Sequence, residues 1–332
     1  MVGNRPETAI VVIGRNEGAR LRNCLVAARK QCRNIIYVDS GSTDDSVEYA
    51  RSTGVDVLQL DPARPFSAAR GRNEGFAWLT GKYPELELIQ FIDGDCELCP
   101  GWIDFAAVQL TQNPAWVLVA GRTIERYPEK SLYNQLCDLE WQVPTGEAQS
   151  CGGIFMIRRQ AFEAAGGFNP QVTSGEEPEL CYRLRQQGWK IHRLDFPMVL
   201  HDAEMTRFSQ WWKRTVRSGH SYAQGYAMHG AGNERYCLRD SLRIWVWALL
   251  LPVMMLALAI ITGSPWWLLL ALAYPLQIFR TMTSINQRLN NRRLALLYAA
   301  FNMAGKWPQL LGQLTFILKK IGQKPITIIE YK

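Results

Sequence analysis

A long uncharged stretch, Ile244 to Phe279, constrains the fold of this chain more than any other feature. Its first part, Ile244 to Thr262, is long enough to cross or nearly cross the hydrocarbon layer of a bilayer, whereas Trp266 to Phe279 is short for a span. Gly263-Ser264-Pro265 breaks the run between the two parts. We therefore predict a transmembrane helical hairpin over 244–279. The alternative is a buried hairpin of a soluble protein.

Basic side chains flank this hairpin on both sides, and the polar N-terminus has no apolar signal-peptide core. Because Lys and Arg favour the cytoplasmic side, both ends of the hairpin are expected in the cytoplasm, at the inner (plasma) membrane. Segment 207–243 is expected to be an amphipathic interfacial connector, and 280–332 a basic loop followed by an amphipathic or re-entrant segment. The flanking cations are Arg235, Arg239, Arg243, Arg280, Arg288, Arg292 and Arg293.

Residues 1–206 alternate short apolar runs with amphipathic segments. This alternation predicts an α/β fold with a doubly wound, mostly parallel sheet, which we assign to a catalytic domain. In such a sheet, ligands lie beyond the carboxyl ends of the strands. The predicted strands include Ile10–Ile13, Ile35–Val38, Val55–Leu58, Leu88–Ile92, Trp116–Ala120 and Gly152–Ile157.

Two carboxylates, Asp93 and Asp95, follow the predicted strand Leu88–Ile92. Like charges this close raise the cost of ionising each other, and a divalent cation removes the conflict. Hard carboxylate oxygens suit Mg²⁺ or Mn²⁺, which also bind substrate phosphates. A surface turn is the alternative for an Asp-Gly sequence. We favour the metal site because other polar residues are expected at the same edge of the sheet, namely Asn16, Glu17 and Asp39.

A second acidic pair, Glu176 and Glu177, lies where a helix is expected to open before Glu179 to Gln187. Acids in the first turn of a helix are stabilised by its dipole, which is the structural explanation. The functional explanation is that one of the two is a general base facing the bound substrate. Both explanations stay open from the residues alone.

The net charge indicates the partners to expect, and the setting of the cysteines indicates whether they form disulfides. A formal net charge of +7 fits anionic partners such as nucleotides or phospholipids. No zinc-finger spacing or RNA-binding aromatic pattern accompanies it, so we expect no nucleic acid. The eight cysteines are expected as free thiols, because the chain is long and has no secretion signal.

Six motifs in this order resemble those of glycosyltransferase family 2, the inverting nucleotide-sugar transferases with a GT-A fold. The resemblance covers about Ala9 to Thr206, and the C-terminal region is similar only in kind to that of membrane-associated members. The motifs are Val11–Glu17, Val38–Asp44, Ala69–Gly75, Asp93–Asp95, Gly166–Phe168 and Gly175–Leu184.

The resemblance implies a set of donor-binding residues. Glu17 and Asp39 would hold the nucleotide base, with Asp39 accepting the imide proton of a uracil. Arg72 matches the arginine of the family's Arg-Asn pair and would contact the diphosphate. Asp93 would lie against the ribose. The other donor-binding residues implied by these motifs are Asn16, Ser40 and Asn73.

The same resemblance implies the metal ligands and the base. Asp95 would ligate the metal, Asp93 would touch its water shell, and His201 would complete the metal or diphosphate site. Glu177 matches the base that removes a proton from the acceptor hydroxyl. The family usually has Glu-Asp where this chain has Glu176-Glu177, so the sequence leaves open which of the two faces the acceptor.

We therefore predict a metal-dependent inverting glycosyltransferase of the hexosyltransferase type. It would move a sugar from a nucleotide-sugar, by default a UDP-sugar, to a lipid-linked or glycan acceptor at the cytoplasmic face of the membrane. One alternative is a nucleotidyltransferase on a similar fold, although the chain has no Gly-rich, Lys-containing triphosphate loop. The other is a non-catalytic membrane scaffold that keeps the fold.

Overall fold

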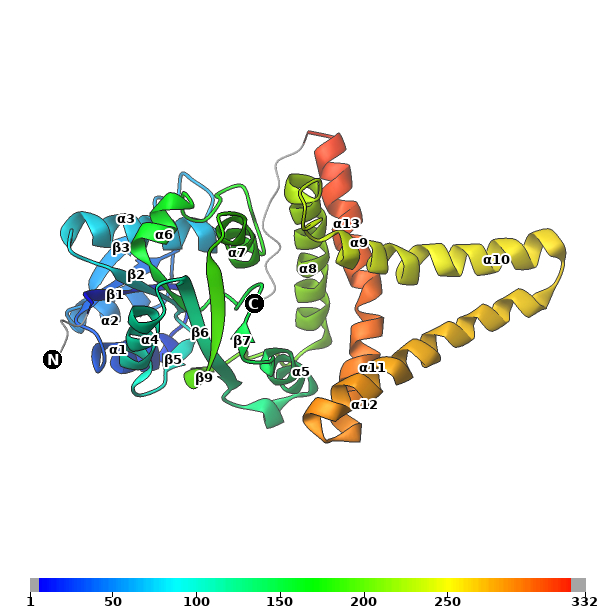
Figure 1. Ribbon diagram of the computed structural model, residues 1–332, viewed down its shortest axis with the longest axis horizontal. Coiled ribbons are helices and arrows are strands. Elements are labelled where there is room, and N and C mark those ends of the chain that lie inside the picture. Colours follow the sequence, from blue (N-terminus) through cyan, green and yellow to red (C-terminus); the bar gives the residue numbers. More distant parts are fainter. Residues whose placement is uncertain (1–5, 324–332) are drawn as a thin grey trace. The chain divides into compact units, whose positions relative to one another are not determined.

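The computed structural model describes residues 6–323, which divide into two compact units. The first unit ends at Glu204 and the second begins at Met205 (Figure 1). This division lies close to residue 206, where the sequence places the end of the catalytic domain.

The N-terminal unit is built on one mixed sheet. Its strands are β1 (Thr8–Gly14), β2 (Asn34–Asp39), β3 (Asp56–Gln59), β4 (Leu88–Asp93), β5 (Cys96–Leu98), β6 (Trp116–Glu125), β7 (Gly146–Glu147), β8 (Phe155–Arg158) and β9 (Lys190–His201). They are ordered β3-β2-β1-β4-β8-β6-β9-β5, with β7 paired to β9. β1 is parallel to β2 and β4, and β2 to β3, whereas β8 is antiparallel to both of its neighbours. The predicted α/β sheet is thus confirmed, and it becomes mixed beyond β4.

Helices cover both faces of this sheet, which explains why its central strands are continuous apolar runs. The helices are α1 (Ala19–Arg29), α2 (Ser46–Ser52), α3 (Ala68–Lys82), α4 (Trp102–Gln112), the short η1 (Pro128–Lys130), α5 (Leu132–Trp141), α6 (Arg159–Ala164) and α7 (Glu176–Gln186). α3 lies directly on β1 and β2, because a Cβ at Gly75 would come within 2.6 Å of Val11 and 2.8 Å of Val38. This contact fixes the motif on α3 against β1 and β2.

The predicted start of α7 at Glu179 is wrong, because the helix already begins at Glu176. Gly175 precedes it in the left-handed conformation, with φ of 79°. Pro178 is compatible with the first turn, where its missing N–H would have no helical partner. The acidic pair therefore stands on the helix itself, at the end where its dipole favours negative charge.

The C-terminal unit is helical in the part that the structure describes. It contains α8 (Phe208–His229), α9 (Leu238–Trp245), the π-helical turn η2 (Val246–Leu250), α10 (Leu251–Thr262), the 3₁₀ segment η3 (Pro265–Leu272), α11 (Ala273–Leu289), α12 (Arg292–Ala304) and α13 (Lys306–Ile321). The backbones of α8 and α13 touch: a Cβ at Gly219 would lie 2.0 Å from the Gln309 carbonyl, and one at Gly312 would lie 2.0 Å from the Val216 carbonyl.

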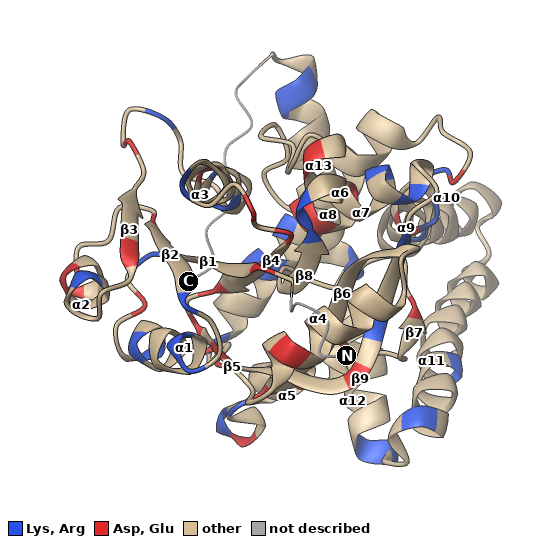
Figure 2. Ribbon diagram, turned by 60° about the vertical axis from the view of Figure 1, so that its left-hand side comes forward, with Lys and Arg blue, Asp and Glu red and all other residues tan. Residues whose placement is uncertain are grey.

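Two helical stretches, Leu238–Thr262 and Pro265–Leu289, are long and apolar enough to cross a membrane by length and composition. The second is longer than the predicted Trp266–Phe279. Only 11% of the first window and 0% of the second is buried within the structure. α10 carries no charged residue (Figure 2). The π-helical turn before α10 has a local cause, since Pro252 cannot donate the hydrogen bond that a regular helix requires. Membrane insertion stays a prediction.

Candidate active site

Parallel pairing brings the ends of three strands to one edge of the sheet. Gly14 at the end of β1 is aligned with Asp39 of β2, and Ile13 is aligned with Asp93 of β4. Asp39 and Asp93, far apart in the sequence, thus flank the same strand. Carboxylates gathered at such an edge form the usual ligand-binding face of a parallel sheet.

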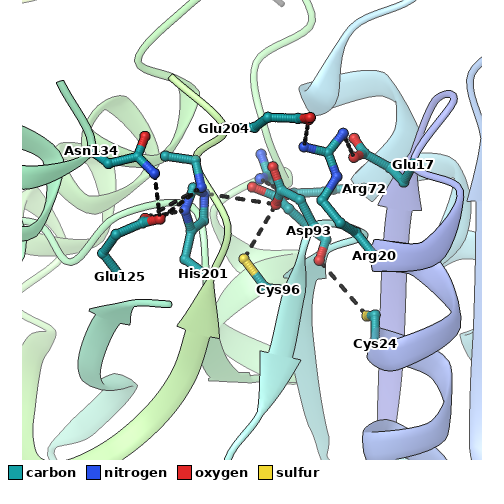
Figure 3. A network of polar contacts seen from close by, with 12 residues as sticks. Glu17, Arg20, Cys24, Arg72, Asp93, Cys96, Glu125, Asn134, His201 and Glu204 are labelled. Atoms are coloured by element: carbon teal, nitrogen blue, oxygen red, sulfur yellow. Dashed lines mark hydrogen bonds and ion pairs between the residues drawn. The ribbon is translucent and has the colours of Figure 1, made fainter. Parts of the chain in front are cut away.

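A second set of residues reaches this region through β9, which pairs with β5 on one side and β6 on the other. His201, the last residue of β9, is aligned with Cys96 of β5 and with Glu125 of β6. Its Nε2 lies 3.7 Å from Asp95 Oδ1, and its Nδ1 lies 3.4 Å from Glu125 Oε2 (Figure 3). The structure therefore brings together Asp95 and His201, two of the three residues that the resemblance assigns to the metal.

Glu125 was missed from the sequence. Its side chain is fully buried and also accepts hydrogen bonds from Asn134 Nδ2, at 3.2 Å, and from the Ala203 amide, at 3.3 Å. Trp141 packs its edge against the His201 ring at 4.4 Å between ring centroids. Metal-binding histidines commonly donate a hydrogen bond from the N–H of their second ring nitrogen to a carboxylate, which fixes the ring and its tautomer. Glu125 is in that position. Extending the predicted strand beyond Ala120 would have marked Glu125 as a strand-end acid.

The donors around Asp95 fit a divalent ion. Oxygen of Asp95, nitrogen of His201 and sulfur of Cys96 all lie within 4.8 Å of one another. Burial and the nearby Asp95 raise the pKa of the Cys96 thiol well above its usual value. The thiol donates a hydrogen bond to Asp95 Oδ1, with 3.3 Å between sulfur and oxygen. A carboxylate with an imidazole suits Mn²⁺ better than a thiolate does. Asp95 and His201 are therefore the residues that would hold the ion.

Asp93, the third predicted metal residue, has a different partner. Its Oδ1 accepts a hydrogen bond of 2.7 Å from Arg72 Nη2, and Arg72 Nη1 donates one of 2.7 Å to Glu176 Oε1. The Arg72 side chain is only 3% exposed. Burial alone would lower its pKa, but the charges of Asp93 and Glu176 outweigh burial and raise it. Arg72 thus remains a cation that joins the two acidic motifs.

Two further features hold Arg72 in this place. Its guanidinium carbon lies 5.5 Å from the centre of the Phe168 ring, which packs in turn against Phe91 in the core. A Cβ at Gly153 would lie 2.8 Å from Arg72 Nη2, so a side chain there would displace the guanidinium from this position. Asn73 anchors the segment that carries Phe168. Its side chain donates a hydrogen bond to the Phe168 carbonyl at 2.7 Å and accepts one from the Phe168 amide at 2.9 Å.

The two residues of the acidic pair point to different surroundings. Glu176 is 13% exposed and holds Arg72. Glu177 is buried, and its Oε1 accepts from the Cys151 amide at 2.8 Å and from the thiols of Cys151, at 3.3 Å, and Cys181, at 2.9 Å. Burial raises the pKa of Glu177, against the lowering effect of these hydrogen bonds.

The predicted base-binding residues organise the loops after β1 and β2. Asp39 is fully buried; its Oδ1 accepts from the Tyr37 hydroxyl, and its Oδ2 from the amides of Gly41 and Ser42, all at 3.0 Å. Asn16 joins the two loops, since its amide donates to Ser42 Oγ at 2.9 Å and its Oδ1 accepts from the Thr43 amide at 2.7 Å. These contacts make Asp39 and Asn16 loop-shaping residues in this structure.

Ser40 and Glu17 lie in the same loops. The amide of Ser40 donates to the Gly14 carbonyl at 3.0 Å. Glu17 lies 2.8 Å from Arg20, another residue missed from the sequence, which also binds Glu204 at 2.6 Å (Figure 3). Arg20 thus ties the loop after β1 to the segment that follows β9.

Comparison with known proteins decides the family. The model of Glycosyl transferase family 2 matches residues 9–166, and that of the N-terminal domain of galactosyltransferase matches residues 137–208. The N-terminal unit belongs to glycosyltransferase family 2. The matches cover every motif residue described above, from Asn16 to His201.

The curated relatives of this chain are distant. A pre-mycofactocin glycosyltransferase of Mycobacterium tuberculosis is 24% identical over 233 residues, which are 65% of this chain and 47% of the relative. A beta-monoglucosyldiacylglycerol synthase of Trichormus variabilis is 22% identical over 233 residues, 64% of this chain and 48% of the relative. The chain thus spans about half the length of these curated relatives.

A solved structure supports the GT-A fold. The mannosyltransferase PcManGT from Pyrobaculum calidifontis, in complex with GDP-Man and Mn²⁺, matches 96% of this chain and 89% of its own with a TM-score of 0.59. The identity is 15%, so the likeness concerns the fold.

Proposed function

We propose that this glycosyltransferase moves a sugar from a nucleoside diphosphate sugar to a lipid-linked acceptor, with inversion and with Mn²⁺ or Mg²⁺ bound. The observation that carries the proposal is the pair Asp95 and His201, 3.7 Å apart, in the same group of strand ends as Asp93. PcManGT, which shares the fold, was solved with GDP-Man and Mn²⁺ and supports this class of donor and metal.

The metal, when bound, would neutralise the diphosphate and stabilise the nucleotide as it leaves. Asp95 and His201 would hold it, and Glu125 would keep the His201 ring oriented. Arg72 would keep Asp93 in place at the donor. A UDP-sugar is the default donor, with Asp39 shaping the loop against which the base would lie.

Glu177 is proposed as the base that takes the proton from the acceptor hydroxyl as its oxygen attacks the anomeric carbon. Burial raises its pKa, and a base with a raised pKa accepts a proton more readily near neutral pH. Glu176 is a poorer base, because its carboxylate is held by the Arg72 cation. Its proposed role is to position Arg72.

A lipid-linked acceptor is proposed from the C-terminal unit. Its two long apolar helices are almost unburied, which suits a membrane, and a relative of this chain is named for a diacylglycerol product. The chain would work at the cytoplasmic face of the inner membrane, since basic residues flank the apolar stretches.

The proposal is tested with the purified full chain, membrane lipid extract and a panel of UDP- and GDP-sugars, with mass spectrometry of the lipid products. We expect a glycosylated lipid that forms only with Mn²⁺ or Mg²⁺ and not with Asp95→Ala. Release of pyrophosphate from a nucleoside triphosphate would instead indicate a nucleotidyltransferase. Absence of metal-dependent nucleotide-sugar binding would indicate a scaffold.

A further inference from the structure

An apolar groove lies within the C-terminal unit, between α8, α9 and α13. Its volume is about 350 Å³, in the range of about 300–1,000 Å³ that is usual for small-molecule sites. Small side chains, Ala223 and Ala227 of α8 and Ser241 of α9, leave the space. Larger ones, among them Trp245 and Phe316, line the rest. The groove therefore follows from the placement of small and large residues on three helices.

A buried amide in the groove has no partner. Gln313 lines the groove and is 1% exposed, yet its Nε2 has no hydrogen-bond acceptor among residues 6–323. A buried donor without an acceptor is costly, so native structures usually supply one. The orphan donor indicates a ligand that carries a hydrogen-bond acceptor.

The groove also offers a positive charge. Lys320, in the last turn of α13, is among its lining residues. Among residues 6–323, no acidic residue is part of the lining. The apolar groove thus contains one cation, Lys320, and one amide donor without an acceptor, Gln313. Such a groove is complementary to a long hydrocarbon chain that carries an anionic, oxygen-rich group.

The groove is continuous with the first apolar helical stretch. Leu238, Leu242 and Trp245 line it and also open the stretch Leu238–Thr262, which is long enough to cross a membrane. A hydrocarbon chain that entered the groove from a bilayer would remain in contact with apolar surface along that helix.

We infer that this groove binds a long-chain lipid phosphate, with the chain against α8 and α9 and the phosphate near Lys320 and Gln313. The inference rests on the proposed function, because it gives the lipid-linked acceptor a second point of attachment besides the sugar-transfer site. It adds a site in the helical unit, separate from the strand-end residues of the sheet.

The test measures binding of dodecyl phosphate to the full chain in amphipol by calorimetry, without any sugar donor. Ala227→Trp fills the groove from an exposed position of α8, and Ser209→Trp is the matched control, because Ser209 is exposed on the same helix outside the lining. We expect Ala227→Trp to weaken binding at least tenfold and Ser209→Trp to leave it unchanged. Equal affinity of wild type and Ala227→Trp would overturn the inference.

The charge is tested separately. Lys320→Gln should weaken dodecyl phosphate binding about tenfold, whereas Lys319→Gln, outside the lining, should not. Dodecanol should bind wild type and Lys320→Gln alike.

A chain that ends at Gln323 tests whether residues 324–332 occupy the groove. If that chain binds dodecyl phosphate more than tenfold more tightly than the full chain, the inference is wrong.

Sugar transfer distinguishes the two proposals. If the proposed function holds, Ala227→Trp raises KM for the lipid acceptor and leaves affinity for the nucleotide-sugar unchanged. If wild type transfers no sugar to any lipid but loses dodecyl phosphate binding on Ala227→Trp, the groove is a lipid site and the proposed function fails.

Discussion

The guanidinium of Arg72 lies 2.7 Å from Glu176, a residue 104 positions further along the chain. The same side chain binds Asp93 on its other side at 2.7 Å. Arg72 therefore couples the acidic end of β4 to the start of α7, where the proposed base stands.

Replacement of Arg72 should damage both stability and transfer. Arg72→Ala leaves Glu176 largely buried without its counter-ion, which we expect to cost about 3 kcal/mol of unfolding free energy. Arg72→Lys keeps the charge but cannot reach both carboxylates with one ammonium group, so turnover should fall more than stability. Thermal unfolding and sugar-transfer rates of the two variants measure this. Full turnover in Arg72→Lys would mean that bridging by two nitrogens is unimportant.

Glu125→Gln should weaken metal binding, because the charge that orients His201 is removed. Loss of such a supporting carboxylate typically costs about 10–100-fold in affinity. The measurement is the affinity for Mn²⁺, determined by calorimetry in the absence of the nucleotide-sugar. The matched control is Glu129→Gln, an exposed glutamate just after the same strand, which should bind Mn²⁺ as wild type does. Unchanged affinity in Glu125→Gln would remove Glu125 from the site.

The two glutamates at the start of α7 should behave differently. Glu177→Gln removes the proposed base and should reduce kcat about 10²–10⁴-fold with the donor dissociation constant unchanged. Glu176→Gln frees Arg72 and should weaken donor binding as well. Steady-state kinetics with titration of the nucleotide-sugar separates the two effects. If Glu176→Gln, and not Glu177→Gln, reduces kcat while the donor dissociation constant is unchanged, the roles of the two glutamates are exchanged.

Gly153→Ala should disturb the site with little effect on the rest of the sheet. The new methyl group would stand 2.8 Å from Arg72 Nη2 and 3.6 Å from Asp93 Oδ2, so the guanidinium must move. We expect transfer to fall at least tenfold. Gly81→Ala is the control: it lies in α3 with no atom within 4 Å of the added Cβ, and should raise stability by about 0.5–1 kcal/mol without changing the rate. Equal rates in both variants would contradict a steric role for Gly153.

Acid should destabilise the C-terminal unit through His220. Burial, with Lys319 and Arg217 nearby, lowers the pKa of His220 to about 4. Because the folded-state pKa lies below the usual value, the stabilisation is complete above about pH 6.5 and is lost as the pH falls toward 4. The loss should reach about 2 kcal/mol at pH 5. Melting of wild type and His220→Gln at pH 7 and 5 checks this, and an equal drop in both would exclude His220 as the cause.

The sequence by itself determined the family, the strand–helix alternation and the strand-end acids, because these depend on local patterns. The run Leu88–Ile92 predicts a buried strand wherever it occurs, and Asp93 and Asp95 must then stand at its end. The length and lack of charge of 244–279 likewise define an apolar helical segment without reference to any other part of the chain.

Only the tertiary structure decided which side chains meet. Glu125 meets His201 because β6 and β9 pair in register, and Arg72 meets Glu176 because α3 packs on β1 and β2. Pairing register and helix packing depend on contacts between distant segments, which leave no mark in the local sequence. For the same reason, the sequence left open whether Glu176 or Glu177 faces the acceptor. In the fold, Glu176 holds Arg72, and Glu177 is buried beside Cys151 and Cys181.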